Sequence, residues 1–204
     1  MKKPTAGSER PKRGAPEETR RRLVAAAAEE FNIRGLHGTT ADLIAARAGY
    51  ATGTFYKHFR DKNEVLVAAY EAWVSEEWNA IGREVLGGGE PEAMARRIVA
   101  LGAELHIRWG GLRRAMFMLV ADDAAAQKSY RALQRRQLKI VESLRKQRGE
   151  GGGCSREADA LVLMTMERAF DAIAQGELRE LNLGRTAILE RVTALLADAL
   201  SPDA

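Results

Sequence analysis

The stretch from residue 39 to residue 62 constrains the fold most, because it combines two short helical patterns with a glycine between them. Leu43 and Ile44 give the first pattern an apolar face, and Gly49 can take the positive φ that often follows a helix end. A second short helix is predicted from about Thr52 to His58. Helix, glycine turn and short polar helix together indicate a helix-turn-helix.

The outward side of the second helix carries small, hydroxylated or cationic side chains. These are the groups that reach phosphates and base edges in the major groove of DNA, and a helix-turn-helix places its second helix there. Lys57 is best suited to contact a guanine. The candidate DNA-binding residues on this helix are Thr52, Gly53, Thr54, Tyr56, Lys57 and His58. For His58, contact with phosphate and plain surface placement remain equally open.

The residues around this motif follow a wider pattern, in order and without gaps. The pattern comprises Arg22 to Phe31, Gly35, Gly38 to Thr40, Ala48 and Gly49, Gly53 to Tyr56, Phe59 and Lys62. In these positions, about a quarter of the chain, the sequence resembles the TetR family of bacterial transcriptional regulators. The resemblance implies that Thr40, Tyr56 and Lys62 contact phosphates.

One position departs from the family pattern. Ala51 occupies the place where the family usually has Ser or Thr, whose hydroxyl caps the reading helix. We expect Thr52 to take over the cap, which would move the start of the helix by one residue.

The chain has a net charge of +4, and its first residues are strongly basic. Residues 1–16 hold five Lys or Arg against Glu9 alone, with Pro and Gly but no apolar periodicity. This composition predicts a disordered basic leader. The leader is either solvated or a basic arm that touches phosphate or a minor groove. Residues 17–66 are predicted to form the helix-turn-helix domain, and residues 67–204 a ligand-binding and dimerisation domain.

Helical periodicity continues through the rest of the chain and predicts an all-α fold of about nine helices. A long fourth helix, from about Lys62 to Gly87, would link the N-terminal domain to the remainder. The last two helices, about 156–175 and 185–200, are apolar on more than one face and need a partner. The resemblance implies a homodimer through these helices, and two related heads would read a palindromic operator.

A small-molecule effector is expected in the second domain, because Met and Trp side chains there can line an adaptable apolar cavity. The same side chains at helical spacing are also typical of an ordinary core. His106 could orient a polar group of the ligand or be a satisfied core histidine. The candidate pocket residues are Trp73, Trp78, Leu101, His106, Trp109, Met116, Met118, Met164, Met166 and Phe170.

Catalysis finds little support, because the sequence has three histidines and neither a nucleophile elbow nor a phosphate loop. Cys154 is the only cysteine, which argues against a disulfide and a cysteine-based metal site, and no cofactor is expected. No apolar run is long enough for a membrane helix, so a cytoplasmic location is expected.

The sequence thus predicts a DNA-binding regulator, a repressor released from its operator by a largely apolar effector. The alternatives are a regulator without an effector or under the control of a partner, including an activator, and, more remotely, a helical enzyme. The operator, the regulated genes and the effector are not specified by the sequence.

Overall fold

The computed structural model describes residues 16–147 and 155–201, and all regular structure within these ranges is helical. The expected all-α fold is confirmed. The predicted basic leader and Cys154 lie outside the described residues, except for Pro16, where the first helix begins. The described helices are α1 (Pro16–Gly38), α2 (Ala41–Arg47), α3 (Thr52–Phe55), α4 (Lys62–Gly87), α5 (Pro91–Arg108), α6 (Gly110–Asp122), α7 (Ala124–Gln147), α8 (Arg156–Gln175), α9 (Glu177–Glu180) and α10 (Arg185–Ala199).

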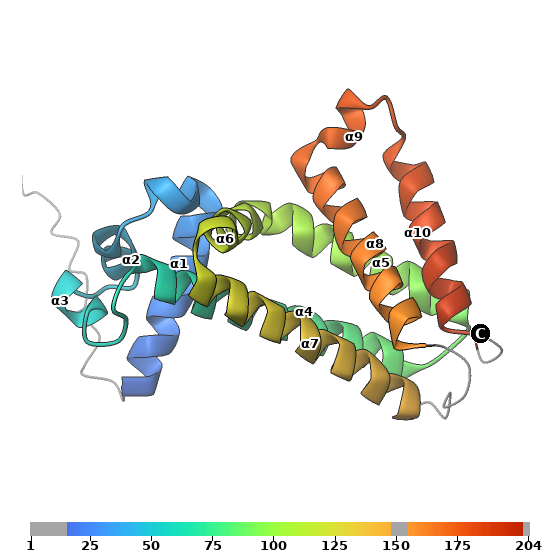
Figure 1. Ribbon diagram of the computed structural model, residues 1–204, viewed down its shortest axis with the longest axis horizontal. Helices are drawn as coiled ribbons and strands as arrows, with labels where there is room; N and C mark the ends of the chain where they lie inside the picture. The colour runs from blue at the N-terminus through green and yellow to red at the C-terminus, as the bar shows by residue number, and fades with distance from the viewer. Residues whose placement is uncertain (1–15, 148–154, 202–204) are drawn as a thin grey trace, which may run out of the picture.

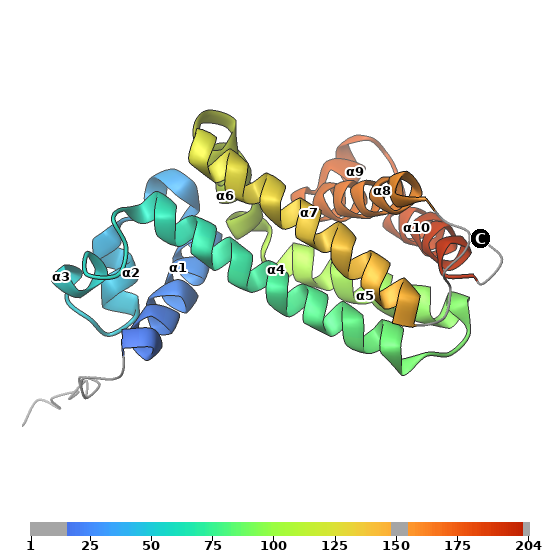
Figure 2. The same cartoon turned by 60° about the horizontal axis from the view of Figure 1, so that its bottom comes forward.

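The molecule is elongated, with α1, α2 and α3 at one end (Figure 1). We call these three helices the head and the helices from α4 onward the body. Helix α4 leads from the head along the body, and α7 lies beside it in both views (Figures 1 and 2). Helix α6 packs against α1, whereas α5, α8 and α10 form the opposite end. The head therefore contacts the body through both α4 and α6.

Two clusters of buried apolar side chains hold these helices together. The first begins in the head, where Leu23, Ala27 and Phe31, spaced four residues apart on α1, are fully buried, and continues through α4, α6 and α7. The second joins the far end of α4 to α5, α8 and α10, with Met94 and Phe170 among its members. The first cluster crosses the predicted domain boundary at residues 66 and 67, and this boundary remains a prediction.

Local side chains explain where the long helices begin and end. Asp61 caps α4, because its carboxylate accepts hydrogen bonds from the amides of Asn63 at 3.0 Å and Glu64 at 2.9 Å. Gly88 ends the same helix with φ of 71°. The glycine can adopt this left-handed conformation without the steric cost that a Cβ would add.

Two features of the helices differ from the sequence-based prediction, the end of α3 and the presence of the short α9. Helix α3 ends at Phe55, since the amides of Lys57 and His58 bond to carbonyls three residues back and turn the chain more tightly than an α-helix. Helix α1 runs on to Gly38 and has a break at Gly35, where φ is 67°. The single turn α9 was not predicted, because four residues are too few to show a helical period.

Candidate functional site

The first candidate site is the outer surface of the helix-turn-helix, which ion pairs hold in position. Arg47 of α2 contacts Glu30 at 2.5 Å and Glu29 at 2.7 Å, and Arg34 contacts Glu30 at 2.7 Å. Burial would raise the pKa of the Glu30 carboxyl, but its pairs with Arg47 and Arg34 outweigh burial and lower the pKa. Helix α2 is thereby fixed on α1, which sets the angle at which α3 is presented.

Helix α3 follows the predicted glycine turn, in which Gly49 has φ of 79°. Phe55 and Phe59 are buried, and their ring centroids lie 5.7 Å apart. These two rings anchor the segment to the head and leave its opposite side facing outward. Of the residues on that side, Gly53, Tyr56 and Lys57 are exposed, whereas Thr52, Thr54 and His58 are half-buried.

The expectation that Thr52 caps this helix is wrong. Ala51 occupies the N-cap position without a side-chain hydrogen bond, and α3 begins at Thr52. The Thr52 hydroxyl instead donates to the Asp42 carboxylate of α2 at 2.5 Å. Thr52 therefore links α2 to α3, and its hydroxyl is already bonded within the protein.

The two residues expected to contact phosphate outside α3 have different surroundings. Thr40 is exposed and caps α2, since its hydroxyl oxygen accepts a hydrogen bond from the Leu43 amide at 3.3 Å. The Lys62 ammonium donates to the carbonyls of Leu36 at 2.8 Å and Thr39 at 3.2 Å. Two of the three Lys62 donors are thus used to join the start of α4 to the end of α1.

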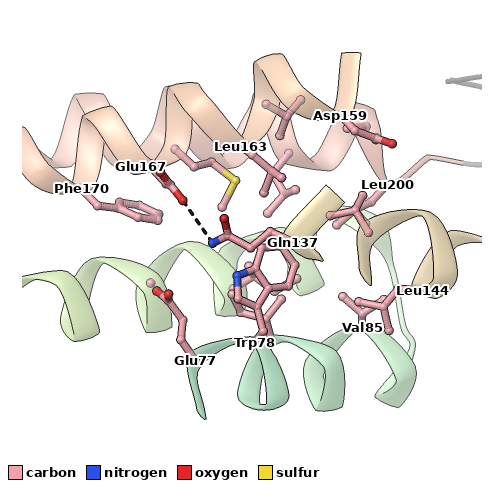
Figure 3. A pocket seen from close by; sticks show the side chains of 18 of the residues that line it. Glu77, Trp78, Val85, Gln137, Leu144, Asp159, Leu163, Glu167, Phe170 and Leu200 are labelled. Carbon is pink, nitrogen blue, oxygen red and sulfur yellow. Dashed lines mark hydrogen bonds between the residues drawn. The ribbon is translucent and has the colours of Figure 1, made fainter. Parts of the chain in front are cut away.

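The second candidate site is a cavity of about 110 Å³ in the body, between α4, α5, α7, α8 and α10 (Figure 3). Its walls are mainly apolar and include several ionisable side chains. They are formed by Glu77, Trp78, Ile81, Val85, Ile98, Gly102, His106, Gln137, Val141, Leu144, Arg145, Asp159, Val162, Leu163, Met166, Glu167, Phe170, Leu196, Ala199 and Leu200. Such a mixture of apolar walls and few polar groups is typical of ligand pockets.

Four of the ten residues predicted for a pocket lie on its wall, namely Trp78, His106, Met166 and Phe170. Phe170 can reach the wall because Gly102 faces it, and a Cβ there would lie 2.6 Å from the Phe170 ring. Whether these residues bind a ligand stays a prediction.

The other six predicted residues lie away from this cavity. Trp73 and Met116 are buried in the first core cluster, and Leu101 and Trp109 are half-buried. Met118 and Met164 are exposed, because each lies two positions from a buried methionine and a step of two residues turns a helix by about 200°.

A buried polar network, which the sequence analysis missed, lies beside the cavity. Arg113 of α6 pairs with Asp171 of α8 through two hydrogen bonds of 2.7 and 2.9 Å, and also donates to the Tyr70 hydroxyl at 3.2 Å. His106 of α5 contacts Asp171 at 3.2 Å and Glu77 of α4 at 3.4 Å. The network thus joins four helices, and its one signal in the sequence was His106 on an otherwise apolar helix, whereas Arg113 is followed directly by Arg114 and did not stand out.

The network shifts the titration of its members. Burial would raise the pKa of Asp171, but hydrogen bonds with His106 and Arg113 outweigh burial and lower it to about 2. For His106, burial lowers the pKa, whereas the contacts with Asp171 and Glu77 raise it by more. The folded protein therefore favours an ionised Asp171 and a protonated His106.

Asn32 of α1 connects the head to the body by hydrogen bonds to the corner between α5 and α6, and we call this contact the clamp. The Asn32 side-chain oxygen in α1 accepts hydrogen bonds from the amides of Gly111 at 3.0 Å and Leu112 at 3.2 Å. Its amide group donates to the carbonyl of Arg108 at 2.9 Å. A Cβ at Gly111 would lie 2.0 Å from the Asn32 carbonyl oxygen, so only glycine permits this approach. The corner between α5 and α6 is therefore fixed on α1.

The described residues show no sign of two other kinds of site, a metal site and a membrane span. No group of three or more His, Cys, Asp or Glu residues suited to hold a metal ion was found among them. Within the same residues, no helix is both long and apolar enough to cross a membrane.

Comparison with known proteins places the head in a family. Residues 23–69 match the model of the bacterial regulatory proteins of the tetR family. The HTH-type transcriptional regulator SrpR of Pseudomonas putida is 48% identical over 52 residues, covering 26% of this chain and 24% of SrpR. The HTH-type transcriptional activator FasR of Mycolicibacterium smegmatis is 38% identical over 73 residues, covering 36% of this chain and 33% of FasR. The chain thus matches about a quarter to a third of the length of these relatives.

The likeness to solved structures extends over the body. The transcriptional regulator FadR of Bacillus subtilis, solved in complex with stearoyl-CoA, has a TM-score of 0.64 and 15% sequence identity. The match covers 87% of this chain and 97% of that structure. At this identity the likeness concerns the fold, which is shared from the head to the last helices.

Proposed function

Because residues 23–69 match the model of the bacterial regulatory proteins of the tetR family, we propose that this chain is a TetR-type transcriptional repressor released from its operator by a small molecule. The repressor acts as a homodimer on a palindromic operator. The effector binds in the cavity between α4, α5, α7, α8 and α10. Membership of a family of DNA-binding regulators also speaks against the enzyme alternative.

The observation that carries this proposal is the continuous connection between the cavity and the head. His106 and Gly102 of α5 line the cavity, and the Arg108 carbonyl at the end of the same helix bonds to Asn32 of α1. A ligand that displaces α5 would therefore act on the head through the clamp, and through α4, which carries Trp78. The head would have one arrangement that binds the operator and one that does not. To shift the balance between them, the ligand needs only to bind the two with different affinities.

The dimer is supported by exposed apolar side chains on α8. Leu161 and Met164 are 64% and 63% exposed and lie three residues apart, on the same face of the helix. Helix α10 lies beside α8 (Figure 1), so both helices predicted for the interface share one side of the body. A second copy would bury these side chains.

DNA binding is assigned to the outward surface of the head. Tyr56 and Lys57 are exposed beside the half-buried Thr54 and His58, and exposed Gly53 lets the backbone approach DNA. In this proposal Tyr56 and Thr40 bond to phosphates, and Lys57 contacts a guanine. Lys62 serves the head itself by bonding to the end of α1.

A DNA-binding assay at fixed salt tests this assignment, with DNA from upstream of the protein's own gene and Tyr56→Phe and Lys57→Ala as variants. Lys57→Ala should cost about 1–3 kcal/mol and change the sequence preference, because a base contact is lost. Tyr56→Phe should weaken binding to all sequences. Lys128→Ala, on the exposed side of α7, should change neither the affinity for DNA nor the sequence preference. Equal binding by wild type and Lys57→Ala would refute the assignment.

An activator is the second candidate, since the matched relative FasR is described as one. The head and the cavity suit both functions. Transcription from the target promoter, measured with and without the protein, separates them by the sign of the change.

A further inference from the structure

The charges around the cavity do not balance. Glu77 and Glu167 line its polar end together with His106, and Asp171 and Arg113 lie next to them in the adjoining network, so three carboxylates face two possible cations. Asp171 is fully engaged with Arg113 and His106, and Glu77 has the remaining contact with His106. Among the residues that the structure describes, one carboxylate therefore has no ion pair even when His106 is protonated.

That carboxylate is Glu167. It lines the cavity, and it accepts a long hydrogen bond of 3.4 Å from the neutral Gln137 amide. Burial raises the pKa of Glu167, and Arg113 and His106 oppose this only in part. Glu167 is half-buried, and a carboxylate with so little compensation is costly in its ionised form, so a cation brought into the cavity would remove that cost.

The geometry around Glu167 suits an organic cation. Figure 3 shows Glu77 and Glu167 extending from facing helices toward the end of the cavity occupied by Phe170. Trp78 forms a further aromatic wall, and aromatic faces attract cations within about 6 Å of the ring centroid. At the opposite part of the lining, Arg145 and Asp159 form an ion pair with one another.

We propose that the effector is a hydrophobic organic cation, whose charge lies by Glu167 and Glu77 and whose apolar part lies among Trp78, Phe170 and Met166. The inference rests on the proposed function in taking this cavity as the effector site. It adds the chemical class of the ligand, and it excludes anionic amphiphiles because they would face the uncompensated carboxylate.

Binding of matched probes tests this. Decyltrimethylammonium, decanol and decanoate share one chain length and differ in charge, and lauroyl-CoA adds a larger anion. Calorimetric titration below the micellar range should give the tightest binding for the ammonium. Glu167→Gln, which keeps the shape, should weaken ammonium binding about 10- to 100-fold, as expected for the loss of a charged partner. It should leave decanol unchanged.

Controls separate a charge effect from a folding effect. Glu104→Gln, on the exposed side of α5, should alter no probe. Glu77→Gln provides a second variant at the site, and a loss of ammonium binding is expected there too. Tighter binding of decanol, decanoate or lauroyl-CoA than of the ammonium would overturn the proposal. Failure of the ammonium to bind, or unchanged ammonium binding in both cavity variants, would also overturn it.

A DNA-release assay distinguishes this inference from the proposed function. Wild-type protein that shows no sequence preference for DNA would refute the regulator function, whatever the probes do. Protein that binds DNA and is released by decanoate or lauroyl-CoA, but not by the ammonium, would refute only the cationic effector.

Discussion

Replacing Asn32 with alanine should loosen the head from the body, because this one side chain makes three hydrogen bonds across the interface. Its oxygen caps the first turn of α6 at Gly111 and Leu112, and its amide group bonds to Arg108. Loss of a cap costs about 1 kcal/mol, and a further hydrogen bond adds about the same. Asn32→Ala should therefore lower the free energy of unfolding by about 2 kcal/mol.

Thermal unfolding at one fixed protein concentration measures this loss, since association also contributes to stability. For a chain of this size, about 2 kcal/mol corresponds to a fall in Tm of roughly 4–8 °C. The control is Asn79→Ala on the exposed side of α4, where alanine is the better helix former and no loss is expected. Equal Tm values for the two variants would show that the clamp does not stabilise the interface and would refute the reasoning.

Three further predictions concern the buried network and α8. Arg113→Ala should cost about 3–5 kcal/mol in urea unfolding, because it removes the bidentate partner of the half-buried Asp171 and leaves only the contact with His106; a loss below 1 kcal/mol would contradict this. The raised pKa of His106 means that its ion pairs stabilise the fold fully below about pH 6.5 and are lost as the pH rises through the folded pKa. His106→Gln should therefore flatten the stability profile on the alkaline side, and an unchanged profile would exclude His106 as the cause. Met164→Asp should produce monomers in sedimentation experiments, whereas Met118→Asp, at an exposed position of α6, should leave the dimer intact. A dimeric Met164→Asp protein would place the interface elsewhere.

Much of the fold follows from local patterns in the sequence. Apolar residues at four-residue spacing, such as Leu23, Ala27 and Phe31, identify a buried helical face without knowledge of what covers it. Gly49 marks the turn between α2 and α3 because few other residues adopt its positive φ. These signals depend on neighbours in the chain, and for that reason they could be read from the sequence.

The candidate sites depend on contacts between distant residues, which a single sequence does not reveal. Arg113 and Asp171 are 58 residues apart, and neither position alone indicates a pair. The bond from Thr52 to Asp42 decides the capping of α3, and it depends on how α2 and α3 cross. For the cavity, the helical period of apolar residues gave only partial information about which side chains form its wall. It separates Met164 from Met166, yet it does not say which buried side chains face a space rather than another side chain.

The internal bonds of Lys62 have a consequence for chimaeras that join this head to another body. The ammonium belongs to the first turn of α4, whereas its acceptors, the carbonyls of Leu36 and Thr39, belong to the end of α1 and the turn after it. A chimaera joined before Lys62 would leave these carbonyls dependent on whatever residue the new body supplies. A junction after the first turn of α4 transfers donor and acceptors together. The unit of exchange between such proteins is therefore longer than the helix-turn-helix itself.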